Sequence, residues 1–150
     1  MDNTYKVYDL TLKVMETGLA YKEITSSKEL VDFIQKSINP SQFPEERVYV
    51  IAFNAKGSPI GYTEHSRGSL SSSVVDLRKI FSFALLTNAS VIAITHNHPS
   101  GAFDPSSDDI ETTKRIAEGC KFLGLNFLDH IITTPFGGYY SFRERGTEPF

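Results

Sequence analysis

Apolar and polar residues follow one another along the chain in a pattern that predicts six strands. Some segments, such as 48–53, are nearly continuous apolar runs, which are typical of strands buried on both faces. Others, such as 5–14, combine partial alternation with many strand-forming side chains. A turn at 54–57 makes 60–64 the hairpin partner of 48–53. The predicted strands cover residues 5–14, 48–53, 60–64, 90–95, 127–132 and 139–142.

Apolar residues at helical spacing predict three helices between these strands. The first begins at the hydroxyl cap Ser26–Ser27, ends at Asn39–Pro40 and carries the apolar stripe Leu30, Val31, Phe33, Ile34 and Ile38. The second spans residues 75–88 and has on one face Leu77, Ile80, Phe81, Ala84 and Leu85. The third spans 107–123, ends at a left-handed cap at Gly124 and buries Ile110, Thr113, Ile116, Ala117, Cys120 and Leu123.

The order of these elements predicts an α/β fold, because hairpins alternate with helical crossovers. We expect a three-layer-like sandwich in which a central mixed β-sheet is flanked by helices. The proline-containing loop before Glu46 divides the chain into two parts. Residues 1–44 are expected to pack as an appendage on the main unit, which spans 45–150. The polar tail from Arg143 to Phe150 is expected to fray.

Length and composition describe an ordinary globular domain. The 150 residues carry a formal net charge of −3, so the chain shows no overall basic footprint for nucleic acid, although a local patch near Lys79, Arg143 and Arg145 stays open. Cys120 is the only cysteine, which excludes an internal disulfide and a cysteine-based metal site, and we expect it to be buried. Neither a signal peptide nor a membrane-spanning apolar run is visible, so we expect a cytoplasmic protein with no membrane partner.

The candidate chemistry is concentrated between residues 96 and 109. His96 and His98 stand at the end of a predicted strand, and the Pro99 and Gly101 that follow show that the strand is ending, so both imidazoles can point into one cavity. Asp109, in the first turn of the next helix, can fold back toward them. Two imidazole nitrogens and one carboxylate oxygen suit Zn²⁺ and leave a fourth position for water.

A simpler interpretation of these residues stays open. A His-x-His pair at a strand end is often only a polar loop, and Ser106 with Asp109 has the spacing of a capping box, which needs no metal. Two further histidines are left outside the ligand set. His130 is expected on the solvent-facing side of its strand, with the alternative that its ring orients a metal ligand. His65 should point to the opposite face of its strand from Glu64.

Together with a glutamate upstream, these residues resemble a known motif. Their order along the chain, which is Glu64, His96-x-His98, a spacer of seven residues, Ser106, two residues and Asp109, is similar to the JAMM motif of the JAB/MPN metallopeptidase superfamily. Five local strings resemble the bacterial RadC family in particular, at residues 64–68, 95–101, 105–109, 128–130 and 139–142. The resemblance covers about residues 45–146.

The resemblance implies the JAB/MPN fold, a cytidine-deaminase-like architecture, with one Zn²⁺ per chain held by His96, His98 and Asp109. It also implies that Glu64 is the general base and that Ser106 hydrogen-bonds the tetrahedral oxyanion. The predicted activity is zinc-dependent hydrolysis of a peptide, isopeptide or other amide bond. Two alternatives stay open, a DNA repair or recombination accessory and a non-catalytic scaffold. The exposed strand of a small mixed sheet is also a candidate surface for pairing with a second copy, which would make a homodimer.

Overall fold

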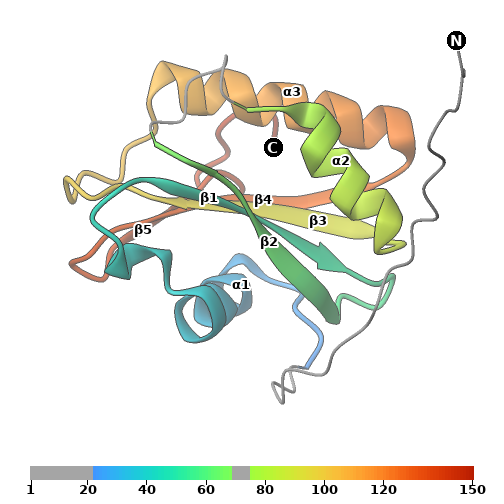
Figure 1. The fold of residues 1–150 in the computed structure, drawn as a ribbon, viewed down its shortest axis with the longest axis horizontal. Helices are drawn as coiled ribbons and strands as arrows, with labels where there is room; N and C mark the ends of the chain where they lie inside the picture. The colour runs from blue at the N-terminus through green and yellow to red at the C-terminus, as the bar shows by residue number, and fades with distance from the viewer. Residues whose placement is uncertain (1–21, 69–74) are drawn as a thin grey trace, which may run out of the picture.

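The computed structural model describes residues 22–68 and 75–150, which form three layers with a mixed sheet in the middle (Figure 1). Helices α2 (Leu77–Leu86) and α3 (Ser107–Leu123) cover one face of the sheet, and α1 (Ser27–Phe33) covers the other. The predicted α/β sandwich with a central mixed sheet is therefore confirmed. The strand predicted at 5–14 lies outside the described residues.

The sheet has five strands in the order β2-β1-β3-β4-β5. They are β1 (Arg47–Phe53), β2 (Pro59–Arg67), β3 (Val91–Asn97), β4 (Asn126–Thr133) and β5 (Tyr139–Ser141). Neighbouring strands are antiparallel except β3 and β4, which are parallel and are connected through α3. The sequence predicted these five strands with small shifts at their ends. Strands β2 and β5 form the two edges, and pairing of an edge with a second copy stays a prediction.

Two apolar clusters fill the spaces between the sheet and its helices, and strand alternation assigns residues to each. In β1, Val48 and Val50 belong to the cluster beneath α2 and α3, whereas Tyr49 and Ile51 belong to the cluster over α1. Cys120 lies in the α3-side cluster and is 1% exposed, as predicted. The same alternation decides which strand residues can face the candidate site.

The first helix begins and ends where the sequence predicted. Ser26 caps α1 through a capping box, the chain continues as a π-helical turn over Ile34–Ile38, and Asn39 ends it in the left-handed conformation. Leu30 on this helix is fully buried against the sheet. The division of the chain at residue 44 stays a prediction. None of the helices within residues 22–68 and 75–150 is long and apolar enough to cross a membrane.

The structure differs from the sequence-based expectations at Leu85, at Leu123 and in the C-terminal tail. Leu85 is 58% exposed and Leu123 is 38% exposed, because each lies at the outer side of its helix, away from the sheet. The C-terminal tail does not fray. The Phe150 ring lies 5.2 Å from the Phe127 ring between centroids, and the Arg143 guanidinium donates a hydrogen bond to the Phe127 carbonyl oxygen at 2.9 Å. These contacts hold the tail against β4.

Candidate metal centre

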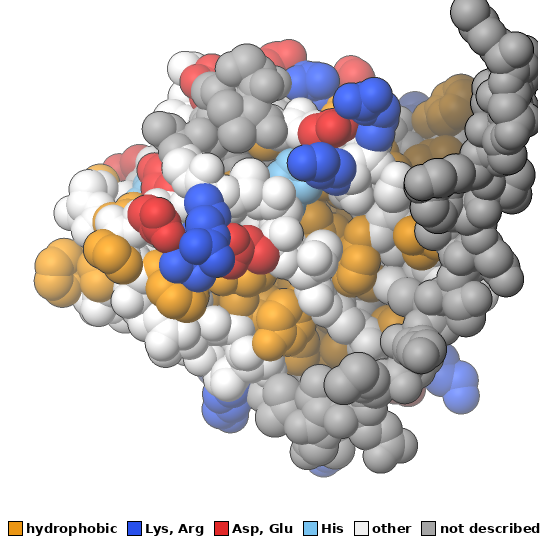
Figure 2. Space-filling view, in the orientation of Figure 1, with side chains coloured by type: hydrophobic (Ala, Val, Ile, Leu, Met, Phe, Trp, Pro, Cys, Tyr) orange, Lys and Arg blue, Asp and Glu red, His pale blue; other side chains and the backbone are white. Residues whose placement is uncertain are grey.

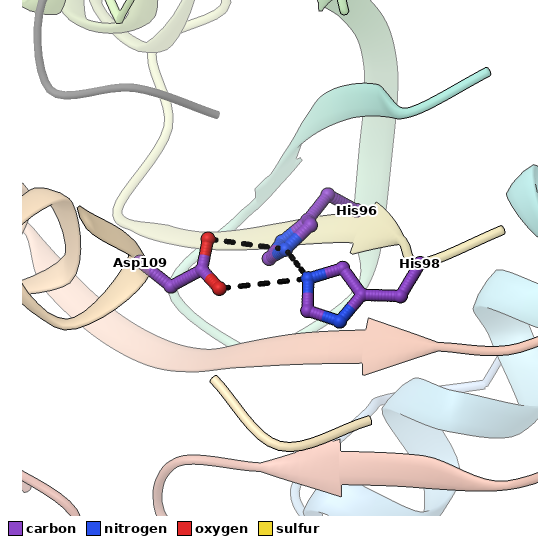
Figure 3. A group of neighbouring side chains, drawn as sticks. All are labelled: His96, His98 and Asp109. Atoms are coloured by element: carbon purple, nitrogen blue, oxygen red, sulfur yellow. Dashed lines mark hydrogen bonds and ion pairs between the residues drawn. The ribbon is translucent and has the colours of Figure 1, made fainter. Parts of the chain in front are cut away.

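The two predicted histidine ligands lie where β3 ends. His96 is the second-last residue of β3 and is fully buried, because its side chain continues the α3-facing row of Ile92 and Ile94. The His98 amide donates to the Thr133 carbonyl oxygen at 2.9 Å, so the backbone still runs beside β4 at this point. Both rings point toward the N-terminus of α3 (Figure 3).

The third predicted ligand comes from the first turn of α3. Ser106 caps this helix, and a capping box closes around it, in which the Ser106 amide donates to Asp109 Oδ2 at 2.7 Å and the Asp109 amide donates to Ser106 Oγ at 3.1 Å. The box fixes the direction of the Asp109 carboxylate, which is 1% exposed and faces both imidazoles (Figure 3).

The structure brings these three side chains together as one group whose donor atoms all lie within 4.8 Å of one another. The two histidine Nε2 atoms are 2.9 Å apart. His96 Nε2 lies 3.3 Å from Asp109 Oδ1, and His98 Nε2 lies 3.5 Å from Asp109 Oδ2. A buried N₂O set of this kind fits a divalent cation such as zinc that accepts imidazole and carboxylate ligands.

The hydrogen bonds around His98 show how it presents its lone pair. Its Nδ1 lies 2.7 Å from the Ala102 carbonyl oxygen, and a carbonyl oxygen only accepts, so Nδ1 carries the proton. In the neutral ring the lone pair is therefore on Nε2, which faces His96 and Asp109. This fixed tautomer is what a metal ligand requires.

The electrostatics of the cluster favour positive charge between the three groups. Burial alone would raise the pKa of the Asp109 carboxyl, but His96 and His98, which donate to it when their Nε2 atoms are protonated, and the Ser106 amide outweigh burial and hold this pKa well below its usual range. The Asp109 carboxylate in turn raises the pKa of His98, against the opposing effect of burial. A metal ion and protons therefore compete for the same buried position.

Comparison with known proteins agrees with this geometry. A family model described as "RadC-like JAB domain" matches residues 24–147. The chain belongs to this family. A UPF0758 protein of Clostridium acetobutylicum is 40% identical over 124 residues, which are 83% of this chain and 53% of that protein. A UPF0758 protein of Flavobacterium johnsoniae is 35% identical over 131 residues, which are 87% of this chain and 56% of that protein. The RadC-like chain thus spans about half the length of these curated relatives.

One expectation within this RadC-like domain is wrong. His130 does not face solvent; it is fully buried and its Nε2 lies 2.8 Å from His96 Nδ1. The reason is a one-residue bulge in β4, because Ile92 pairs with Phe127 whereas Ile94 pairs with His130. The extra residue reverses the alternation and turns His130 toward α3. The alternative, a ring that orients a metal ligand, stays a prediction, and the contact with His96 is the one that it requires.

The predicted general base, Glu64, lies on the other face of the sheet. It pairs with Tyr49 of the α1-side cluster, and its carboxylate accepts hydrogen bonds from the Tyr49 hydroxyl at 3.3 Å, from Arg47 at 3.3 Å and from Arg67. The hydrogen bond from Arg67 is the main reason why the pKa of Glu64 lies below its usual value. The structure does not bring Glu64 to the three ligands, so its role stays a prediction that this placement does not favour.

A second bulge explains the position of Glu64. Val48 pairs with Ser66 but Tyr49 pairs with Glu64, so His65 is an extra residue in β2 and the alternation reverses there. His65 faces away from Glu64, as expected, and its Nε2 accepts a hydrogen bond from the Asp76 amide at 3.2 Å. On the face shown in Figure 2, Lys and Arg side chains lie beside Asp and Glu side chains and form no continuous basic patch.

The sequence reasoning missed a different carboxylate, Glu46. It stands directly before β1 and two residues before Val48, which pairs with His96, so it would lie on the α3 side of the sheet if the alternation of β1 continues to it. Its negative charge is the smallest of the influences that raise the pKa of His98, after the larger contributions of Asp109 and the Ala102 carbonyl oxygen. The signal in the sequence is that Glu46 stands just before the predicted strand 48–53. This signal points to the site only once β1 is known to pair with β3.

Asn97, between the two histidines, ties the segment that carries Glu46 to β3. Its side-chain oxygen accepts from the Arg47 amide at 2.8 Å, and its amide group donates to the carbonyl oxygens of Glu45 at 3.0 Å and Phe43 at 3.2 Å. Because Asn97 is fully buried, these bonds have no competition from water. They fix the backbone on both sides of Glu46.

Proposed function

We propose that this RadC-like domain is a zinc-dependent hydrolase of amide bonds, with peptide or isopeptide substrates. The observation that carries the proposal is the buried convergence of His96 Nε2, His98 Nε2 and the Asp109 carboxylate, with the His98 tautomer already set for binding. Three protein ligands, rather than four, are the number typical of catalytic zinc sites. A zinc ion held by these side chains would act as a Lewis acid and make water a nucleophile near neutral pH.

Ser106 has a role at the edge of this site. Its Oγ accepts the Asp109 amide hydrogen in the capping box, and that bond does not use the proton of its own hydroxyl group. Because Ser106 is exposed, this proton can be donated to the oxyanion that develops when an amide carbonyl is attacked. The same residue then caps α3 and stabilises the transition state.

The general base must lie within reach of the attacking water. We assign this role to the Glu46 carboxylate, because continued strand alternation would put it on the same face as the ligands and because its charge contributes to the raised pKa of His98. There it would accept a proton from water and return it to the leaving amine nitrogen. The earlier candidate, Glu64, is bound by Arg47 and Arg67 on the opposite face, and its lowered pKa also makes it a weaker base.

Metal analysis and two matched substitutions test the proposal. Zinc-reconstituted protein is expected to hold one zinc per chain by elemental analysis and to cleave members of a panel of peptides and isopeptide-linked dipeptides. Glu46→Gln should keep its zinc and lose about 10²- to 10⁴-fold in kcat, while Glu64→Gln keeps most activity. His98→Ala should lose the zinc.

Three results would contradict parts of this proposal. A wild-type protein that binds no divalent metal at micromolar concentrations would refute the metal-dependent function. Stoichiometric zinc without cleavage of any panel member would support a scaffold role instead. If Glu64→Gln abolished cleavage and Glu46→Gln did not, the assignment of the base would return to Glu64.

A further inference from the structure

Four buried groups form a continuous hydrogen-bonded chain that begins and ends at proposed metal ligands. His96 Nδ1 lies 2.8 Å from His130 Nε2, and His130 Nδ1 lies 2.7 Å from Thr113 Oγ1. Thr113 Oγ1 donates to the Asp109 carbonyl oxygen at 2.6 Å. All four residues are at most 1% exposed, so water does not replace any of these partners.

The chemistry of the last group sets the direction of the whole chain. A carbonyl oxygen only accepts, so the Thr113 hydroxyl proton points to Asp109 and the Thr113 oxygen accepts from His130 Nδ1–H. In the neutral His130 ring, which is fully buried, the lone pair is then on Nε2. This lone pair accepts from His96 Nδ1–H, and the neutral His96 ring then presents its own lone pair from Nε2.

We propose that His130 and Thr113 are positioning residues that hold His96 as the tautomer protonated on Nδ1, with its Nε2 directed at the metal position. The inference rests on the proposed metal binding. Both proposed histidine ligands would then be protonated on Nδ1, but for different reasons. His130 and Thr113 fix the tautomer of His96, whereas the Ala102 carbonyl oxygen fixes the tautomer of His98. The Phe142 ring stacks on His130 with centroids 4.8 Å apart and an interplanar angle of 7°, which fixes the plane of the ring that receives the bond.

Breaking the chain at Thr113 should reverse both tautomers. In Thr113→Val the His130 Nδ1–H loses its acceptor, so His130 is expected to move its proton to Nε2 and donate to His96 Nδ1. His96 would then carry its proton on Nε2 and could bind a metal through that atom only after that proton is displaced. Thr113→Ser keeps the hydroxyl group and should keep the wild-type arrangement.

Thr112→Val is a matched control in the same helix. Thr112 is 1% exposed, and its hydroxyl group has no hydrogen-bond partner among the described residues. The substitution therefore makes the same chemical change at a neighbouring buried position without breaking the chain. A general effect of Thr→Val on the packing of α3 would appear in both variants.

The test reads tautomers directly and does not need enzymatic activity. Protein labelled with ¹⁵N-histidine is examined at about pH 8, where unperturbed imidazoles are neutral, by two-bond ¹⁵N–¹H correlation with and without zinc. Wild type, Thr112→Val and Thr113→Ser should show His96 and His130 protonated on Nδ1. Thr113→Val should show both protonated on Nε2 in the metal-free protein and bind zinc about 10- to 100-fold more weakly.

The outcomes separate this inference from the proposed function. If wild-type His96 carries no proton on Nδ1, or if Thr113→Val keeps both wild-type tautomers and the zinc affinity of Thr112→Val, the inference is overturned while zinc binding stands. If the wild-type protein shows the expected tautomers but binds no zinc, the proposed function fails and the chain remains as a structural feature. His130→Gln, which retains an acceptor and a donor, gives a second variant if Thr113→Val does not fold.

Discussion

Replacing Asp109 by asparagine separates its two roles, because asparagine retains an oxygen for the Ser106 amide but loses the charge that faces His96 and His98. In the metal-free protein the variant should lose stability only modestly. Charged hydrogen bonds contribute about 1 kcal/mol more than neutral ones, and an acidic group in the first helical turn adds about 0.5 kcal/mol. Because Asp109 Oδ2 makes both kinds of interaction, we expect a loss of about 1.5 kcal/mol without metal.

Zinc should widen this difference. A ligand that binds only the folded state at 100 times its Kd stabilises that state by about 2.7 kcal/mol. Wild type should gain this amount, and the variant, with two of its three ligands and no carboxylate, should gain almost none. The difference in unfolding free energy then grows from about 1.5 to about 4 kcal/mol, or about 8 to 16 °C in Tm for a domain of this size.

Thermal or urea unfolding followed by circular dichroism, in EDTA and in excess zinc, measures both differences. Asp108→Asn is the matched control, because Asp108 carries the same charge in the same turn but is exposed and lies outside the ligand group. It should keep the whole gain from zinc. Equal stabilisation of wild type and Asp109→Asn by zinc would refute Asp109 as a ligand. If Asp108→Asn also lost the stabilisation by zinc, the effect would come from negative charge in the first turn of α3 and not from metal ligation.

Four further outcomes are expected. Below about pH 4 the metal-free stability difference between wild type and Asp109→Asn should shrink in urea titrations, because a carboxyl whose pKa is lowered by folding stabilises the protein fully above its unfolded pKa and loses this contribution as the pH falls toward its folded pKa. Burial raises the pKa of the Cys120 thiol to about 12, so Ellman's reagent at about pH 8 should react with it only after unfolding. Ser106→Ala should cost about 1 kcal/mol in urea unfolding and keep its zinc. Arg143→Ala should cost about 1 to 2 kcal/mol, since it releases the tail from β4.

The convergence of His96, His98 and Asp109 was predictable because each of these side chains is set by short-range structure. A strand that ends at Asn97 presents His96, and the proline and glycine that follow turn His98 back beside it. The helix start that follows places Asp109 by its own capping box, which sequence spacing alone indicates. These steps need no knowledge of how the strands pair.

Glu64 and His130 differ from the predicted arrangement because of how neighbouring strands of the sheet pair. One bulge in β2 turns Glu64 away from the site, and one bulge in β4 turns His130 into it. A bulge adds a single residue and reverses every later side chain of its strand, yet nothing in the composition of these strands marks it. The C-terminal tail was expected to fray for a related reason, because it is held by Phe127, which is near it in space but distant in the sequence.

At the end of β3, the arrangement of the site depends both on short-range structure and on the pairing of strands. His96 and His98 can approach the same point only from the α3 side, so Asn97 between them must face elsewhere, and it binds the backbone on both sides of Glu46. A single tripeptide thus supplies two ligands and the anchor for the proposed base. The spacing of the base from the ligands is then a property of the β1–β3 register, and a slip of one residue would move Glu46 to the opposite face while leaving the ligand group intact.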